Sequence, residues 1–280
     1  MGITPLTPQA ITILEKRYLK KDARGQVIES PEEMFWRVSK NIAEAERCYG
    51  HQSSPEELSE IFFRMMSSLD FLPNSPCLMN AGRNLQQLAA CFVLPVEDSL
   101  DSIFETVKQT ALIHQSGGGT GFSFSHLRPK DDAVQSTGGI ASGPVSFMRV
   151  FNMATEVIKQ GGTRRGANMG VLRVDHPDIM EFINIKKDSK EMTNFNLSVG
   201  VTKAFMEALA RGGDFGLINP RSKKEMRRLK AREVIEALVD AAWETGDPGV
   251  LFLDRINEAN PTPQLGEIES TNPCGEVPLL

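Results

Sequence analysis

Apolar positions at helical spacing mark the first 70 residues of the chain. Ser30 and Pro31 form a typical helix start, and so do Ser54 and Pro55. Apolar stripes follow each start, at Met34, Trp36, Val38 and Ile42 and then at Leu58, Ile61, Phe62 and Met65. We therefore predict a helical domain over residues 1–70.

Beyond Leu72–Pro76, short apolar runs alternate with amphipathic stretches. The runs predict strands at 91–94, 122–124, 169–174, 196–201, 215–218 and 250–253. Helices are expected between them, at 102–115, 144–160, 176–183, 202–210 and 222–246. Strand–helix alternation with short turns is typical of α/β proteins with parallel strands, so we predict a second, α/β domain over 71–280.

Composition narrows the class of protein. The chain has 280 residues, 40% of them hydrophobic and 24% charged, with a net charge of −5. This is an ordinary globular composition, and it indicates neither a nucleic-acid partner nor a membrane partner. The basic run Lys223–Arg232 is interpreted as the solvated face of a helix. With no signal-peptide pattern and no apolar run of ~20 residues, a cytoplasmic location is expected.

The cysteines do not suggest a metal site. There are four, Cys48, Cys77, Cys91 and Cys274, without a CxxC pair, and the four histidines are scattered. We therefore predict no metal-binding residues and expect thiols or catalytic disulfides in a reducing compartment.

The segment Asn272-Pro273-Cys274-Gly275-Glu276 carries the strongest chemical signal. In an extended loop, side chains alternate, so Asn272, Cys274 and Glu276 would point the same way. A thiol can carry a radical or a thiolate, a carboxylate can move a proton, and an amide can orient a hydroxyl. The pentapeptide alone leaves a second interpretation open, a turn around a buried structural cysteine.

Four other segments are interpreted one at a time. Cys91 lies in an apolar run typical of structural cysteines. Gly117–Gly121 could cradle a phosphate but lacks the Walker A residues, so a tight turn is favoured. Gly161–Asn168 has glycines around Arg164 and Arg165, which favours a loop that binds a ligand. Asp98–Asp101 is a sufficient helix cap.

Taken together, these segments resemble the catalytic chain of ribonucleotide reductases, specifically the adenosylcobalamin-dependent class II form. The resemblance rests on segments in family order between about residue 70 and residue 280. They are Pro73–Pro76, Cys91 with Asp98–Ile103, Ser116–Gly121, Lys159–Val174 and Asn272–Leu279.

The resemblance implies a ten-stranded α/β barrel built from two five-stranded halves, with a finger loop through its centre. This chain would hold the N-terminal helical domain, the first half of the barrel and the finger loop. Enzymes of this family continue for several hundred residues beyond the position of Leu280. The 280 residues alone are therefore expected to be inactive.

The same resemblance assigns roles to individual residues. Cys274 would carry the thiyl radical, Glu276 would act as general base and Asn272 would hold the substrate. Cys91 would help to expel the 2′-hydroxyl and then form a disulfide with a cysteine beyond Leu280. Substrate contacts are expected at Ser75, Ala90, Gly121 and Arg164, and contacts with a dNTP effector at Asp98, Arg128 and Lys159. Ala90 departs from the serine common in the iron-dependent class.

The implied cofactor is adenosylcobalamin, bound mostly by residues beyond Leu280, with an external dithiol such as thioredoxin as reductant. The implied substrate is a ribonucleoside di- or triphosphate, and a homodimer is expected. Two alternatives stay open: the large subunit of a class I reductase, and a nucleotide-binding regulatory or assembly module without turnover.

Overall fold

The structure, a computed structural model, describes residues 3–50, 53–134, 138–158 and 166–280. It divides into two compact units, Met1–Ala90 and Cys91–Leu280, which are described separately below. The division lies C-terminal to the domain boundary at 70/71 that we expect from the sequence. The predicted end of a helix at 160 falls outside the described residues.

The first unit is helical. It contains α1 (Pro8–Arg17), α2 (Pro31–Glu44), a short 3₁₀ helix (Ala45–Cys48), α3 (Pro55–Ser67) and α4 (Ser75–Asn80). Ser30 and Ser54 each form a capping box with the glutamate three residues later, which confirms both predicted helix starts. The core of this unit combines residues of α2 and α3 with Cys77 and Leu78 of α4. Because α4 packs into this core, the compact unit continues past residue 70.

A buried ion pair fixes α4 to α2. Arg37 Nε lies 2.6 Å from Glu29 Oε1, and the Arg37 guanidinium also donates to the carbonyls of Leu78 and Ala81. Burial alone would raise the pKa of the Glu29 carboxyl, but hydrogen bonds from Arg37 and from the Lys20 N–H outweigh it and lower that pKa. The pair therefore joins the segment before α2 to the end of α4.

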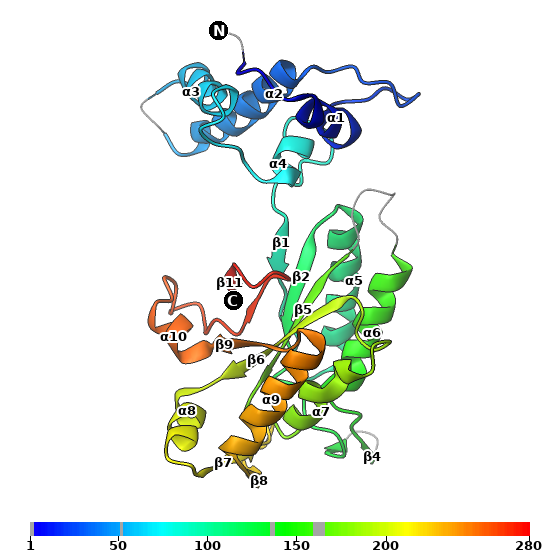
Figure 1. Cartoon of the computed structure of the whole chain (residues 1–280), viewed down its shortest axis with the longest axis vertical. Helices are drawn as coiled ribbons and strands as arrows, with labels where there is room; N and C mark the ends of the chain where they lie inside the picture. Colours follow the sequence, from blue (N-terminus) through cyan, green and yellow to red (C-terminus); the bar gives the residue numbers. More distant parts are fainter. Residues whose placement is uncertain (1–2, 51–52, 135–137, 159–165) are drawn as a thin grey trace. The chain divides into compact units, whose positions relative to one another are not determined.

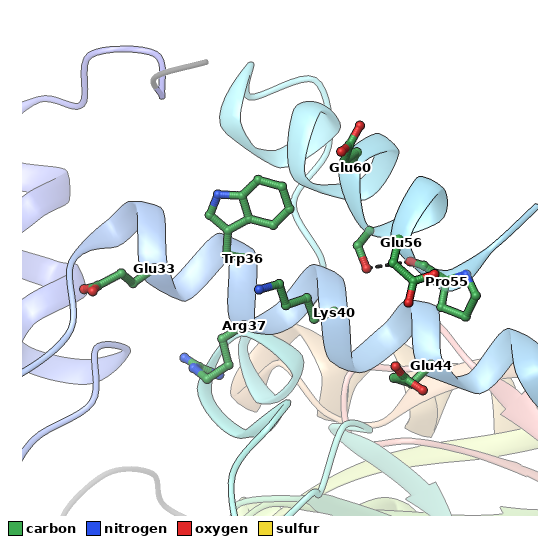
Figure 2. A pocket seen from close by; sticks show the side chains of 9 residues that line it. Glu33, Trp36, Arg37, Lys40, Glu44, Pro55, Glu56 and Glu60 are labelled. Carbon is green, nitrogen blue, oxygen red and sulfur yellow. Dashed lines mark hydrogen bonds between the residues drawn. The ribbon is translucent and has the colours of Figure 1, made fainter.

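A groove of about 720 Å³ runs between α2 and α3. Figure 2 shows its lining, in which Trp36 and Lys40 of α2 lie among the carboxylates of Glu33, Glu44, Glu56 and Glu60. The Trp36 ring stacks on Phe63 with 4.0 Å between centroids, and Lys40 Nζ lies 5.6 Å from the Trp36 ring. The groove is therefore lined by charges of both signs around one aromatic ring.

The second unit is built on a parallel sheet. Its elements are β1 (Cys91–Val93), α5 (Leu100–Gln115), β2 (Gly119–Ser123), β3 (Ala133–Val134), β4 (Gly139–Ile140), α6 (Pro144–Val157), β5 (Asn168–Arg173), α7 (Ile179–Asn184), a 3₁₀ helix (Ile185–Lys187), β6 (Phe195–Val201), α8 (Lys203–Ala210), β7 (Asp214–Ile218), β8 (Glu225–Lys230), α9 (Ala231–Thr245), β9 (Gly249–Phe252), α10 (Leu253–Glu258), β10 (Ser270–Thr271) and β11 (Pro278–Leu279). The main sheet has the order β1-β2-β5-β6-β9, and every neighbouring pair is parallel. This confirms the predicted α/β class and is consistent with one half of the expected barrel.

The helices α5 to α9 pack on one face of this sheet. Their apolar residues form one core with alternate strand residues, such as Phe122 of β2 and Leu197 and Val199 of β6. The β10–β11 hairpin and α10 lie on the opposite face, as Figure 1 shows within this unit. The two faces thus differ. One is covered by helices and forms the core, and the other carries the β10–β11 hairpin (Ser270–Leu279), which we call the finger loop.

One helix prediction in this unit is wrong over its first part, and another is shifted at its start. The helix predicted over 222–246 begins only at Ala231, because Glu225–Lys230 forms strand β8 and pairs antiparallel with β7. The straight-chain residues of this stretch favour a helix locally, and strand pairing overrides that preference. The basic run is therefore the exposed edge of a two-stranded ribbon. The helix predicted from residue 102 begins at Leu100, with Ser99 as its cap.

Candidate functional site

The register of β1 on β2 places Cys91 on the face that carries the finger loop. Cys91 pairs with Gly119 and Val93 pairs with Gly121. Because side chains alternate along a strand, Cys91 and Val93 share a face and Phe92 points to the other. Phe92 lies on the helix side, where it closely approaches Gly118. Cys91 is half-buried at the first position of β1.

Glycines in β2 let the finger loop lie directly on the sheet. A Cβ on Gly121 would stand 1.7 Å from the Thr271 carbonyl oxygen, and one on Gly119 would stand 2.8 Å from the Pro273 ring. The loop therefore runs along β2 in the opposite direction. Gly117–Gly121, for which a turn is favoured from the sequence, has its last three residues in a strand. A contact of Gly121 with substrate stays a prediction.

The Asn272–Glu276 segment is a turn, so the extended loop considered from the sequence is wrong. Strands β10 and β11 pair antiparallel on either side of it, and Gly275 has φ +82°. The Gly275 N–H donates to the Asn272 carbonyl at 3.0 Å, and the Val277 N–H donates to Asn272 Oδ1 at 2.9 Å. These bonds turn the Asn272 side chain into the hairpin, where it is fully buried.

The Cys274 thiol is exposed at the apex of this turn. The alternative interpretation is a turn around a buried structural cysteine. The turn is present, but the cysteine is not buried, so this interpretation is wrong on that point. Glu276 is also exposed. Its carboxylate Oε1 lies 3.8 Å from Cys91 Sγ, across a sequence separation of 185 residues. The fold thus brings together a thiol and a carboxylate, with a second thiol two positions from that carboxylate.

Asn272 offers an unused donor in this site. Its Oδ1 is taken by the Val277 N–H, whereas its buried Nδ2 has no hydrogen-bond partner among the described residues. A buried donor without a partner costs about 1–3 kcal/mol. A substrate oxygen would be a suitable partner for it.

The base of the finger loop is held by charged and amide side chains. His126 Nε2 lies 2.6 Å from Glu269 Oε2, and His126 Nδ1 lies 3.7 Å from Glu97 Oε2. The hydrogen bond that His126 donates to Glu269 raises the pKa of His126, against the effect of burial and with help from the two carboxylate charges. Asn257 of α10 pairs with both backbone groups of Ile268.

His126 faces a polar cavity of about 290 Å³ at the carboxyl ends of β2 and β5. Other charged or titratable groups that line it are Arg173, Asp175, His176, Lys223, Glu267 and Glu269. Sequence reasoning missed His126 and Glu269, which are 143 positions apart and belong to no motif. The sequence contains no signal that would have joined them.

Two of the three predicted effector residues meet at another cavity. Arg128 Nε lies 2.8 Å from Asp98 Oδ2, and both residues line a cavity of about 470 Å³ beside the start of α5. Lys159, the third, and Arg164, a predicted substrate contact, lie outside the described residues. Ser99 caps α5 as expected for this segment, so Asp98 itself is left to bind Arg128.

The remaining predicted substrate residues belong to the helical unit. Ser75 is exposed at the start of α4, and its Oγ lies 2.9 Å from the Tyr18 hydroxyl. Ala90 is half-buried and is the last residue of that unit. Nothing in the sequence indicates that Tyr18 would contact Ser75.

A buried polar chain lies under the sheet. His114 Nε2 is 3.0 Å from Thr120 Oγ1, which donates to Asn168 Oδ1 at 2.9 Å, and Asn168 Nδ2 donates to Thr155 Oγ1. Burial lowers the pKa of His114, so this imidazole is neutral at pH 7. This series of hydrogen-bonded side chains links α5, β2, β5 and α6, and it lies beside Gly166.

No group of three His, Cys, Asp or Glu side chains that could hold a metal ion occurs in the described part of the chain. Within the same residues, every helix is too short or too polar to cross a bilayer.

Comparison with known proteins gives a consistent result. The family model described as "Ribonucleotide reductase, all-alpha domain" matches residues 4–86, and "Ribonucleotide reductase, barrel domain" matches residues 89–280. A vitamin B12-dependent ribonucleoside-diphosphate reductase of Thermoplasma acidophilum is 51% identical over 98% of this chain and 43% of its own length. One of Mycobacterium tuberculosis (strain H37Rv) is 52% identical over 98% of this chain and 39% of its own length.

A ribonucleoside-diphosphate reductase large subunit of Dictyostelium discoideum is more distant, with 32% identity over 94% of this chain and 32% of its own length. The chain spans less than half the length of each of these relatives. The two family models together cover nearly the whole sequence and divide it close to the boundary between the compact units. The chain belongs to the ribonucleotide reductase family.

Proposed function

We propose that this chain forms part of an enzyme that reduces ribonucleotides to 2′-deoxyribonucleotides by thiyl-radical chemistry. The observation that carries the proposal is the 3.8 Å approach of Cys91 Sγ to Glu276 Oε1, in a turn that exposes Cys274 two positions before Glu276. Radical transfer needs a thiol, proton transfer needs a carboxylate, and reduction of the substrate needs a second thiol as electron donor.

Two of these groups would act at the 3′ position of the ribose and one at the 2′ position. Cys274, as a thiyl radical, would take the 3′ hydrogen, because S–H and activated C–H bonds have similar strength. Glu276 would accept the 3′-hydroxyl proton. Cys91 would supply a proton to the departing 2′-hydroxyl and, with a second thiol, two electrons as a disulfide forms. Asn272 Nδ2, a donor without a partner among the described residues, would hold a ribose oxygen.

The B12-dependent relatives favour adenosylcobalamin as cofactor over a separate metal subunit. When bound, that cofactor supplies the carbon-centred radical that oxidises a thiol. The residues present fit this use, because Cys274 is exposed at the tip of a turn. A dithiol such as thioredoxin would return the Cys91 disulfide to thiols, and the substrate would be a ribonucleoside di- or triphosphate.

A dNTP effector would bind in the cavity lined by Asp98 and Arg128. The proposed homodimer would form beside it, because apolar side chains of α5 and α6 are more than half exposed there. They are Leu100, Phe104, Leu112, Met153 and Val157. A second copy that covers this row would also close the cavity, since Leu100 belongs to both.

The test is reduction of ribonucleotides by the full-length reductase. We expect deoxyribonucleotide formation with adenosylcobalamin and a dithiol, and none when either is omitted. Activity that requires an added metal subunit would assign the class I alternative. Nucleotide binding without product under every condition would assign the regulatory or assembly module.

A further inference from the structure

The bonds within the finger-loop turn fix its shape but not its position on the sheet. Asn272 Oδ1 accepts from Val277 N, and the Asn272 carbonyl accepts from Gly275 N. Both bonds join residues of the same hairpin. Packing of Pro273 on Gly119 brings the apex to the sheet, and a hydrogen bond from the sheet would fix the height of this apex, where Cys274 lies.

Asn196 of β6 reaches the apex. Its Nδ2 donates to the Pro273 carbonyl at 2.7 Å, across 77 positions of sequence. Proline has no N–H, so this carbonyl is the only backbone polar group that Pro273 can offer. The bonded carbonyl belongs to the residue directly before Cys274.

The sheet register explains why Asn196 can make this bond. Val93 pairs with Gly121, Gly121 with Met169, and Met169 with Asn196. Laterally paired residues share a face, so Asn196 lies on the face that carries the finger loop. It is also the only residue of β6 that is exposed, in a strand whose other six positions are buried.

We propose that Asn196 is a positioning residue that fixes the apex of the finger loop, and with it the Cys274 thiol, over the sheet. The inference rests on the proposed function insofar as Cys274 performs the chemistry. Asn196 acts through the Pro273 carbonyl, so its amide influences the reaction only by where it holds Cys274 relative to Cys91 and Glu276.

The test replaces the amide by a carboxylate of the same shape. Asn196→Asp removes the donor and turns a charge toward the Pro273 carbonyl. Asn184→Asp is the matched control, because Asn184 Nδ2 donates to the Met180 carbonyl at 2.8 Å within α7, which packs on the helix-covered face. Both variants are made in the full-length reductase.

The first measurement is hydrogen exchange of the Gly275 and Val277 amides, because a turn whose apex is released from the sheet opens to solvent more often. It needs neither cofactor nor substrate. In Asn196→Asp we expect the exchange rates of these amides to rise at least about fivefold, which corresponds to loss of one hydrogen bond. In Asn184→Asp we expect no change in these rates. Steady-state kinetics is the second. A displaced thiol should lower kcat by roughly 10- to 100-fold while KM changes less than about twofold.

Unchanged exchange in Asn196→Asp would overturn the proposal, and so would faster exchange with the kcat of the unsubstituted enzyme. An equal response in Asn184→Asp would also overturn it, since it would indicate general destabilisation. If the unsubstituted enzyme formed no deoxyribonucleotide, the proposed function would fail separately, and the exchange data would still decide whether Asn196 anchors the apex.

Discussion

His126 Nε2 lies 2.6 Å from Glu269 Oε2, which ties the end of β2 to the base of the finger loop. The pair lies on the segment that leads to the Cys274 turn, and Asn257 holds the neighbouring residue Ile268. The loop is thus fixed at its base by a charge pair that can titrate.

The first prediction concerns pH. The pKa of His126 is raised in the folded protein, so its stabilising effect is complete below the unfolded value of about 6.5 and is lost as pH rises through the folded pKa. Glu269→Gln should therefore lower the melting temperature at pH 6, and the difference from the unsubstituted protein should shrink at higher pH. Glu267→Gln, at a second carboxylate of the same cavity, is the control. A difference that grows with pH would contradict this assignment.

The second prediction concerns the glycine under the finger loop. Gly121→Ala would place a Cβ against the Thr271 carbonyl, so the loop must move away from β2. We expect a loss of about 1–3 kcal/mol in the free energy of unfolding and faster proteolysis near residue 271. Gly213→Ala is the control, because the nearest atom to its Cβ would be at 3.7 Å. Equal protease resistance of the two variants would show that the loop does not need Gly121.

The third prediction concerns the effector. Asp98→Ala should weaken dNTP binding by roughly tenfold or more, as for a hydrogen bond to a charged group, and change substrate affinity less. Asp101→Ala, an acidic residue in the first turn of α5, is the control. Separate calorimetric titrations with a dNTP and with a substrate ribonucleotide give the two affinities. An unchanged dNTP affinity in Asp98→Ala would remove this residue from the effector site.

The fourth prediction is that a protein of these 280 residues alone does not turn over. Cys91 needs a second thiol, and the sequence offers only Cys48, Cys77 and Cys274. Cys77 is buried, and burial raises the pKa of its thiol, while Cys274 is assigned to the radical. Product formation after several cycles, measured with cofactor and dithiol present, would show that the assignment of Cys91 is wrong.

Much of the fold follows from local patterns. The apolar runs at 91–94, 169–174, 196–201 and 250–253 correspond to four strands of the main sheet, because short runs rich in β-branched and other apolar residues favour strands. Strand β8 was not predictable, since its Lys, Arg, Glu and Leu residues favour a helix until β7 pairs with them.

The sequence identifies candidate residues for the site but does not indicate their geometry. The Asn272–Glu276 motif identifies the loop, yet the turn follows from bonds that Asn272 makes within the hairpin. The approach of Cys91 to Glu276 depends on strand register and on glycines in β2 on which the finger loop packs. The glycines are visible in the sequence, but neither the register nor the packing is. Asn196 and His126 were missed because isolated polar residues in strands and loops carry no motif.

The most direct test of the central claim is single-turnover reduction by Cys274→Ser in the full-length enzyme with prereduced thiols. We expect no deoxyribonucleotide, since a hydroxyl does not readily carry the radical, whereas Cys48→Ser, at an exposed thiol of the helical unit, should form as much product as the unsubstituted enzyme. Formation of one equivalent of product by Cys274→Ser would contradict the account.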